Sequence, residues 1–275
     1  NVRRAAEETP ASEFNLWWLG QSGFLIQWQH RHLLLDPYLS DSLTKKYALT
    51  DKPHVRMSER VVAPEELGFV DIITSSHNHT DHLDAETIVP ILKLNPKLSI
   101  VIPEANREFV SNRLKIIADL PIGLDEGKHC HIHGFDIHAI ASAHECIDRD
   151  DAGRCVYLGY VIEFGGWTIY HSGDTILYPE LPKTLKQWSV DLALLPINGA
   201  KSERRVAGNL NAREAAELGR EIGARCVIPC HYDLFEFNTA DPADFTAACA
   251  QYHVNGRVLE LGERWSSTEL PRSDR

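Results

Sequence analysis

The six residues His77-Asn78-His79-Thr80-Asp81-His82 include four side chains that can bind a metal ion. They follow an apolar run over residues 70–74, which is typical of a buried strand. Three imidazoles and a carboxylate crowded at a strand end are costly to bury unless a cation satisfies them. The spacing therefore predicts a metal site rather than a polar loop with one incidental ligand.

Three further candidate ligands lie downstream of this motif, namely His144, Asp174 and His231. Each of them comes shortly after an apolar segment whose composition is typical of a strand. In layered α/β folds, the loops at strand ends aim side chains into one crevice. Seven candidate ligands at four strand ends therefore predict a binuclear metal centre.

The order His-x-His-x-Asp-His, then a distant His, an Asp and a last His, resembles the signature of the metallo-β-lactamase superfamily. Within that superfamily, the chain is most similar to the L-ascorbate-6-phosphate lactonase-like branch of metal-dependent hydrolases. The segments that carry this likeness are Leu16-Trp17-Trp18-Leu19-Gly20-Gln21-Ser22-Gly23-Phe24, Leu35-Asp36-Pro37-Tyr38, Leu195-Pro196-Ile197-Asn198-Gly199 and Pro229-Cys230-His231-Tyr232-Asp233-Leu234-Phe235. The resemblance runs from about residue 16 to residue 262 and so covers nearly the whole chain.

The resemblance implies that His77, His79 and His144 hold a first ion. It also implies that Asp81, His82 and His231 hold a second ion and that Asp174 bridges the two. The spacing agrees, because His77 and His79 point the same way in an extended turn. Adjacent Asp81 and His82 can instead diverge towards a neighbouring ion. Oxygen-reducing di-iron relatives carry Glu at the second motif position, where this chain has His79, so the resemblance implies hydrolysis.

The ligand types leave the identity of the metal open. Histidine-rich sites suit Zn²⁺, two carboxylates also allow Mn²⁺ or Fe²⁺, and the lactonase-like resemblance favours Mn²⁺. Two such ions roughly 3.5–4 Å apart would share a water and lower its pKa, and the resulting hydroxide would attack carbon or phosphorus. Asp81 would orient this nucleophile as well as ligate, and Tyr232 is a candidate donor to the developing oxyanion. No Gly-x-Ser-x-Gly elbow is present, which disfavours serine catalysis.

The composition of the 275-residue chain limits its partners and setting. A net charge of -11 disfavours nucleic acid, whose phosphates need a basic surface. No apolar run reaches the length of a membrane span, so integral membrane association is not expected. The six Cys form no CxxC pair and no compact disulfide framework, which favours a reducing, cytoplasmic setting. The expected partner is a small anionic substrate, and a homo-oligomer is compatible with the sequence.

The order of elements predicts an α/β fold, a four-layer αββα sandwich of two sheets between helices. A single domain is expected over residues 14–265, between a flexible N-terminal tail, 1–13, and a C-terminal tail, 266–275. Strands are expected over residues 16–19, 24–27, 33–35, 98–102, 156–164, 167–170, 191–197 and 257–261. Helices are expected over residues 85–94, 104–117, 211–222 and 242–252.

The loop after strand 191–197 carries Asn198, Lys201, Arg204 and Arg205. Cationic side chains near a metal site suit a phosphate or carboxylate on the substrate, and we predict substrate binding by these four residues. A solvated loop whose charges pair with Glu203 is an equally open alternative. The long connection over residues 38–60 is a second candidate lid, because loops of that length are more often functional than idle.

Several other residues that could bind metal are better explained without one. Asp84 precedes a predicted helix and is expected to cap its N-terminus. His129, His131 and His133 alternate along a strand with no acidic neighbour in the sequence, which favours a solvated strand face. Cys226 and Cys230 share one face of a predicted strand and are expected to be small core residues rather than zinc ligands.

The leading hypothesis is therefore a metal-dependent, lactonase-like hydrolase that opens a lactone or ester of a small anionic, sugar-phosphate-like substrate. The first alternative is a phosphodiesterase on the same centre, acting on a cyclic nucleotide or a phospholipid head group. The alternative from another class is a non-catalytic sensor whose metal site only binds a ligand. The complete ligand set disfavours the sensor, because loss of catalysis usually degrades such a set.

Overall fold

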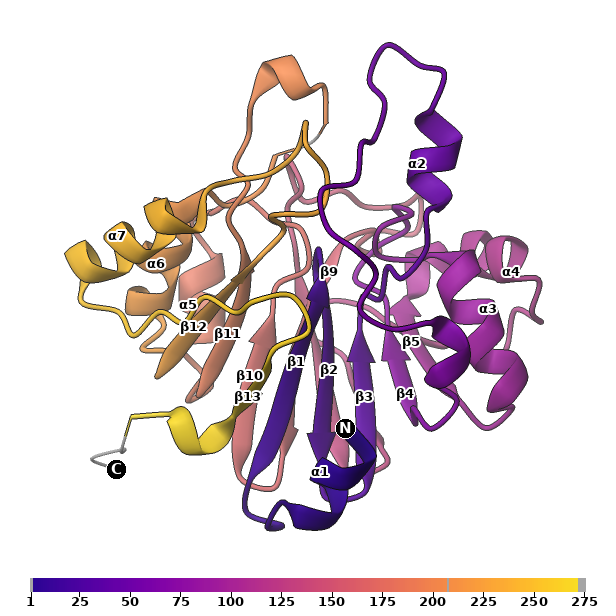
Figure 1. The fold of residues 1–275 in the computed structure, drawn as a ribbon, viewed down its shortest axis with the longest axis horizontal. Coiled ribbons are helices and arrows are strands. Elements are labelled where there is room, and N and C mark those ends of the chain that lie inside the picture. Colours follow the sequence, from indigo (N-terminus) through magenta and orange to yellow (C-terminus); the bar gives the residue numbers. More distant parts are fainter. Residues whose placement is uncertain (1, 207, 272–275) are drawn as a thin grey trace.

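The computed structural model describes residues 2–206 and 208–271 of the chain. Its strands form two sheets, and helices lie on the outer sides of this pair (Figure 1). The seven-stranded sheet has the order β13-β1-β2-β3-β4-β5-β6, and the six-stranded sheet has the order β12-β11-β10-β9-β8-β7. The αββα sandwich predicted from the sequence is confirmed.

The seven-stranded sheet consists of β1 Phe14–Gly20, β2 Gly23–Trp28, β3 Arg31–Leu35, β4 Ile72–Thr74, β5 Ser99–Pro103, β6 Ile122–Leu124 and β13 Arg264–Ser266. The six-stranded sheet consists of β7 His129–Ile132, β8 Phe135–Ala141, β9 Leu158–Phe164, β10 Trp167–His171, β11 Leu192–Pro196 and β12 Cys226–Cys230. The α-helices are α1 Val2–Glu8, α2 Ser42–Tyr47, α3 Ala85–Leu94, α4 Arg107–Leu114, α5 Leu181–Leu185, α6 Ala212–Glu221 and α7 Pro242–Tyr252. Short 3₁₀ turns are η1 Pro64–Glu66, η2 Glu104–Asn106, η3 Ser202–Arg204 and η4 Ser267–Glu269.

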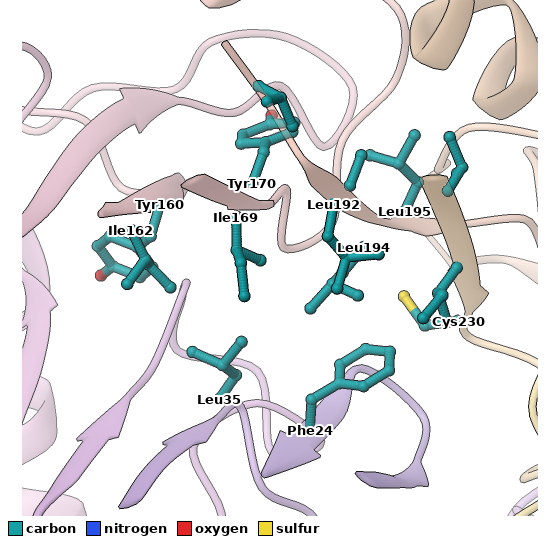
Figure 2. Packing of buried hydrophobic residues seen from close by; sticks show 14 of the residues in the cluster. Phe24, Leu35, Tyr160, Ile162, Ile169, Tyr170, Leu192, Leu194, Leu195 and Cys230 are labelled. Carbon is teal, nitrogen blue, oxygen red and sulfur yellow. The ribbon is translucent and has the colours of Figure 1, made fainter. Parts of the chain in front are cut away.

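The main core lies between the two sheets and follows from the alternation of side chains along each strand. Phe24 and Leu35 of the first sheet face Ile169 and Leu194 of the second, and all four are completely buried (Figure 2). The neighbouring residues Leu25 and Leu34 point the other way, into a second cluster with Ile88 and Ile91 of α3. Burial on both faces explains why these strands are apolar almost throughout.

Both sheets contain parallel strands, and these determine where the polar loops emerge. Strands β3, β4, β5 and β6 are parallel in the first sheet, as are β10, β11 and β12 in the second. Parallel neighbours end at the same edge of a sheet, so the loops that follow them open together. Two long loops rise at this end of the molecule, one carrying α2 and the other following β11 (Figure 1).

Both chain ends differ from the predicted tails. Val2 and Ala5 lie one turn apart on α1 and pack against the apolar cluster around Trp17, because residues three apart share a helix face. At the other end, Ser267 and Leu270 are buried beyond β13. The packed structure therefore begins before residue 14 and continues past residue 265.

Two elements differ in extent from the predictions. Residues 257–261, expected as a strand, form no strand, and the first sheet is instead completed by β13, which pairs with β1. The helix expected over residues 104–117 is split into η2 and a shorter α4, which ends where Lys115 adopts the left-handed conformation, φ 58°. By contrast, α3 and α7 have the predicted bounds. No helix in the described residues is both long and apolar enough to cross a bilayer.

Asp84 caps α3 as predicted, and it also connects this helix to Ser42, the first residue of α2. Its carboxylate accepts hydrogen bonds from the backbone of Glu86, from the Thr87 hydroxyl at 2.5 Å and from the Ser42 hydroxyl at 2.9 Å. The helix begins directly after the histidine motif, so the cap also fixes the end of that loop.

We expect Asp84→Ala to lower the free energy of unfolding by about 1–2 kcal/mol, because a helix cap with buried partners is lost. Asp84→Asn keeps an acceptor oxygen and should cost clearly less. Chemical denaturation of the two variants measures the difference. Equal stability of the alanine variant and the parent would show that the cap does not stabilise the loop.

Candidate metal centre

The histidine motif forms a tight loop between β4 and α3. The backbone amides of His82 and Leu83 both donate to the carbonyl of His79, at 3.1 and 2.9 Å, which closes a turn. Asp36, directly after β3, supports this turn: its carboxylate accepts from the Ser76 backbone at 2.9 Å and from Nδ1 of His82 at 2.7 Å. These bonds aim the rings of the motif towards the second sheet.

The first predicted ligand group, His77, His79 and His144, is assembled in the structure. One nitrogen of each ring lies within 4.8 Å of the others, a spacing suited to a shared ion. His144, which follows β8, donates from Nδ1 to the carbonyl of Gly208 at 2.9 Å. This bond fixes the tautomer of His144 and leaves its Nε2 free to bind a metal.

The second predicted group, Asp81, His82 and His231, is also assembled within 4.8 Å. Asp174 lies between the two groups. Its carboxylate oxygens are 3.4 Å from Nε2 of His82, 3.3 Å from Nε2 of His231 and 3.5 Å from Nε2 of His144. Asp174 thus contacts ligands of both groups, which is the placement that a bridging ligand requires.

Unpartnered polar atoms test whether these residues fit metal ions. Nε2 of His77, Nε2 of His82 and Oδ1 of Asp174 are buried without a hydrogen-bond partner among the described residues. Burial holds the pKa of His77 well below its ordinary value, so its ring is neutral and able to ligate. Burial also opposes protonation of His82, but Asp174 and Asp81 outweigh it and hold the pKa of His82 well above its ordinary value. The cluster attracts positive charge, and metal ions would satisfy these atoms.

A third close group, Asp36 with His77 and His82, has a different role. Both oxygens of Asp36 already accept hydrogen bonds, from Ser76 and His82. Asp36 therefore orients the ring of His82, as the outer partners of metal-binding histidines do. No spacing in the sequence marked Asp36 as a partner of the metal ligands, although the Leu35-Asp36-Pro37-Tyr38 segment carried part of the resemblance.

Gln21 is a second residue near the centre that the predictions missed. It lies in the turn between β1 and β2, and its side-chain amide is 2.8 Å from Oδ2 of Asp81 and 3.0 Å from Nε2 of His231. The backbone carbonyl of Gln21 also accepts a hydrogen bond from the backbone amide of His231 at 3.0 Å. The turn that joins β1 and β2 thus helps to fix both Asp81 and His231.

A cavity of about 480 Å³ opens over the ligand cluster. His79, Asp81, His144, Asp174 and His231 line its floor. Its walls are aromatic and cationic, with contributions from Lys46, Tyr47, His54, Phe109, Arg113, Tyr157, Arg205, Phe235 and Phe237. The volume is that of a site for a small molecule.

Tyr232, predicted as an oxyanion donor, does not line this cavity. Its ring stacks on Trp18 with the centroids 4.3 Å apart, and its hydroxyl donates to the carbonyl of Leu259 at 2.9 Å. The preceding His231 has a positive φ of 64°, so the backbone turns and directs Tyr232 away from the ligands. Burial also raises the pKa of Tyr232, which makes it a poorer proton donor. The predicted catalytic role is therefore corrected to a structural one.

Of the four predicted substrate-binding residues, only Arg205 lines the cavity over the ligands. Arg204 is buried and donates to the carbonyls of Asn198 and Thr239, so it holds its own loop together. Asn198 is buried in hydrogen bonds with Asn209 and Asn238. Lys201 lines a different hollow, together with Arg204 and Asn198. The spacing in the sequence could not predict where these four side chains point, because the loop folds back on itself at η3.

The other candidate metal residues lie outside the centre. Cys226 and Cys230 are buried in β12, as predicted. His131 is exposed on β7, but it does have an acidic partner: its Nδ1 lies 2.8 Å from Asp136 on the neighbouring strand. The expectation of no acidic neighbour failed because the contact is made across strands.

Comparisons with known proteins agree with this architecture. The family model for the beta-lactamase superfamily domain matches residues 15–231. A UPF0173 metal-dependent hydrolase of Methanosarcina mazei is 30% identical over 255 residues, which cover 90% of this chain and 95% of that protein. Another, from Methanosarcina barkeri, is 32% identical over 252 residues, with 90% and 95% covered.

Among solved structures, the chain is similar to Igni18, described as a novel metallo hydrolase from Ignicoccus hospitalis. The TM-score is 0.67 at 22% identity, and the match covers 92% of this chain and 98% of that one. This likeness supports the fold. The lactonase-like branch is not distinguished by these comparisons and stays a prediction.

The role of Tyr232 can be tested by removing only its hydroxyl group. We expect Tyr232→Phe to lower the free energy of unfolding by about 1–3 kcal/mol, because the buried carbonyl of Leu259 loses its donor. Turnover of any substrate should stay close to that of the parent, since the hydroxyl points away from the cavity. A large fall in kcat with unchanged stability would restore the catalytic role.

The ligand assignment can be tested by elemental analysis of protein purified without chelator. We expect up to two transition-metal ions per chain in the parent and the loss of at least one in His144→Ala, because a ligand of the first group is removed. His131→Ala is the matched control, since it removes an exposed histidine from β7, in the sheet whose strand β8 precedes His144. This variant should keep the metal content of the parent. Full metal content in His144→Ala would contradict the assignment.

Proposed function

We propose that this chain, which belongs to the beta-lactamase superfamily and to the UPF0173 metal-dependent hydrolases, opens a lactone or related ester of a small anionic substrate at a binuclear metal centre. Membership of these families supports metal-dependent hydrolysis as the reaction. The number of ions, their identity and the substrate are part of the proposal.

The observation that carries the proposal is the composition of the cavity above the ligands. Its floor presents the predicted metal ligands, and its walls present Lys46 and Arg205 beside aromatic rings, while Arg113, the third cation of the walls, donates to the carbonyls of Asn78 and Leu83. A substrate that fills it would thus place a reacting group over the metal ligands and a charged group near Lys46 and Arg205. An anionic ester with a compact, partly apolar body fits this distribution.

The seven predicted ligands, five histidines and two aspartates, suit Zn²⁺ and also allow Mn²⁺ or Fe²⁺. When bound, such ions supply an activated water and stabilise the negative charge that develops on the carbonyl oxygen. The chain itself must keep the ligands in place. Gln21 fixes the carboxylate of Asp81, Asp36 orients His82, and the Gly208 carbonyl orients His144.

Arg205 is the cavity residue best placed to hold a charged group of the substrate. It forms an ion pair with Asp51 at 2.6 Å, and both side chains are largely exposed. Exposed ion pairs are weak, so a phosphate or carboxylate of the substrate can displace Asp51 at little cost. Lys46 has no carboxylate partner among the described residues and packs over the ring of Tyr47, 5.0 Å from its centroid.

The choice of a lactone over a phosphodiester rests on the resemblance to the lactonase-like branch, and turnover separates the two. The test is hydrolysis of a panel of phosphorylated and neutral lactones and p-nitrophenyl phosphodiesters, with and without added Mn²⁺ or Zn²⁺. We expect metal-dependent opening of an anionic lactone. Turnover of the phosphodiesters alone would replace the lactonase proposal, and binding without turnover of any substrate would favour a sensor.

The charge of the substrate can be tested on the cavity wall. We expect Lys46→Ala and Arg205→Ala, alone and combined, to raise KM for a phosphorylated lactone, because contacts remote from the scissile bond bind ground state and transition state alike. The double change should cost about 1–3 kcal/mol in binding. A neutral lactone of similar size should be hardly affected.

Lys201→Ala is the matched control, since Lys201 is a cation in the same loop that faces a different hollow. Its KM for the phosphorylated lactone should equal that of the parent. Equal losses on charged and neutral substrates in the Arg205 variant would instead indicate a structural role for the loop. No loss on either would remove the anionic group from the proposal.

A further inference from the structure

We propose that His54 is a catalytic residue of this hydrolysis, which donates a proton from Nε2 to the leaving oxygen of the substrate. The inference rests on the proposed function and deepens it. No sequence motif marks His54, which lies in the connection between α2 and η1.

His54 shares the cavity with the metal ligands. It lines the same hollow as His79, Asp81 and His231, and that hollow measures about 480 Å³. A cavity of this size holds one small molecule in contact with most of its walls. A substrate that fills it can therefore contact the metal ligands and the wall that contains His54 at once, and the proposal places the leaving oxygen on the His54 side of the carbonyl carbon.

The ring of His54 is held by aromatic neighbours on several sides. It stacks on Tyr47 with the centroids 4.2 Å apart and the planes at 15°, and it contacts Phe237 at 4.5 Å and Phe235 at 5.2 Å. Rings packed in this way keep a fixed orientation, which a proton donor needs.

Backbone pairing ties the His54 segment to the loop that follows the last metal ligand, His231. The amide of Met57 donates to the carbonyl of Leu234 at 2.9 Å, and the amide of Glu236 donates to the carbonyl of Val55 at 3.0 Å. This short antiparallel bridge, with Arg56 opposite Phe235, joins the two segments. The position of His54 relative to the centre is thus set by the fold rather than by a free lid.

The tautomer of His54 leaves one nitrogen available. Nδ1 lies 3.3 Å from the carbonyl of Lys52, and because a carbonyl only accepts, Nδ1 carries the hydrogen. Nε2 has no partner among the described residues and is absent from the buried unpartnered atoms, so it is accessible. When protonated, Nε2 is a donor that nothing in the protein occupies.

Among the cavity residues outside the predicted ligands, His54 has the chemistry best suited to proton transfer near neutral pH. Tyr157 contacts the rings of His79 and His144, but burial raises its pKa, which makes it a weaker acid. Burial lowers the pKa of His54, the hydrogen bond to the Lys52 carbonyl and the charge of Asp81 oppose this shift, and Lys46 adds to it. The lower pKa makes the protonated ring a stronger acid and also reduces the fraction of the ring that is protonated at neutral pH.

The proposed step consumes one water and needs neither an oxidant nor a reductant. The oxygen of a water forms a bond to the carbonyl carbon, and the bond from that carbon to the leaving oxygen breaks. The leaving oxygen takes the electron pair of the broken bond together with the proton from Nε2 of His54. The water has lost one proton to solvent, and His54 regains one from solvent, so no other reactant is consumed.

The test compares leaving groups in His54→Phe, a change that keeps a ring for Tyr47, Phe235 and Phe237 to pack against. For esters with an alkyl leaving group, or for lactones, we expect kcat to fall by about 10²–10⁴-fold, because an alkoxide leaves poorly without a proton. For p-nitrophenyl esters, whose leaving group needs no proton, the fall should be no more than a few-fold.

A second variant guards against a folding effect. His54→Ala opens a space for imidazole, and added imidazole should restore turnover of alkyl esters in a concentration-dependent way, with no effect on the parent. Metal content should be parental in both variants. His30→Phe, at an exposed histidine in the turn between β2 and β3, is the matched control and should behave as the parent with every ester.

The outcomes separate this inference from the proposed function. An equal fall with good and poor leaving groups, without imidazole rescue, would assign His54 a structural role and overturn the inference alone. Unchanged kcat with alkyl esters would overturn it as well. A parent protein that hydrolyses no ester or lactone with metal added would overturn the proposed function and, with it, this inference.

Discussion

The structure depends on one electrostatic constraint, the need to compensate a group of buried imidazoles and carboxylates at the edge of an apolar core. His77, His82 and Asp174 are almost fully buried, yet each keeps a polar atom without a partner. Each such buried polar atom without a partner costs free energy. A chain that retains this arrangement therefore needs cations at that position, and the surrounding elements serve to hold the ligands ready for them.

The two sheets divide this task between them. The first sheet supplies the motif after β4 and its support, Asp36 after β3, while the second supplies single ligands after β8, β10 and β12. The closely packed core between the sheets, around Phe24 and Leu194, keeps these separate loops at fixed positions relative to one another (Figure 2). Neither sheet alone carries a complete set, so the fold must form before the centre exists.

The sequence predicts the parts of the site that depend on local spacing. The six-residue motif, the cap at Asp84 and the strand with Cys226 and Cys230 are local patterns, and the structure has them where expected. The direction of Tyr232 could not be predicted, because it depends on a left-handed residue, His231, that no composition rule marks. Strand β13 was missed since its three residues gain their partner only from β1, at the other end of the chain.

The residues that we propose to contact the substrate were the hardest to predict, and the reason is physical. Lys201, Arg204 and Arg205 are close in sequence and similar in chemistry, yet the loop buries one, turns one to another hollow and leaves only Arg205 at the cavity. His54 carries no motif at all and reaches the cavity because its segment pairs with the loop after β12.

The centre and its walls are therefore built under different constraints. Ligands at strand ends must satisfy a fixed coordination and leave a local signature, as His77 to His82 do. Much of the wall comes from the long loop that carries α2 and the loop that follows β11, and the Arg205–Asp51 ion pair joins these two loops. Such loops can change without disturbing the core, so one metal centre can serve different substrates, and the substrate of this chain is encoded in the wall residues rather than in the motif.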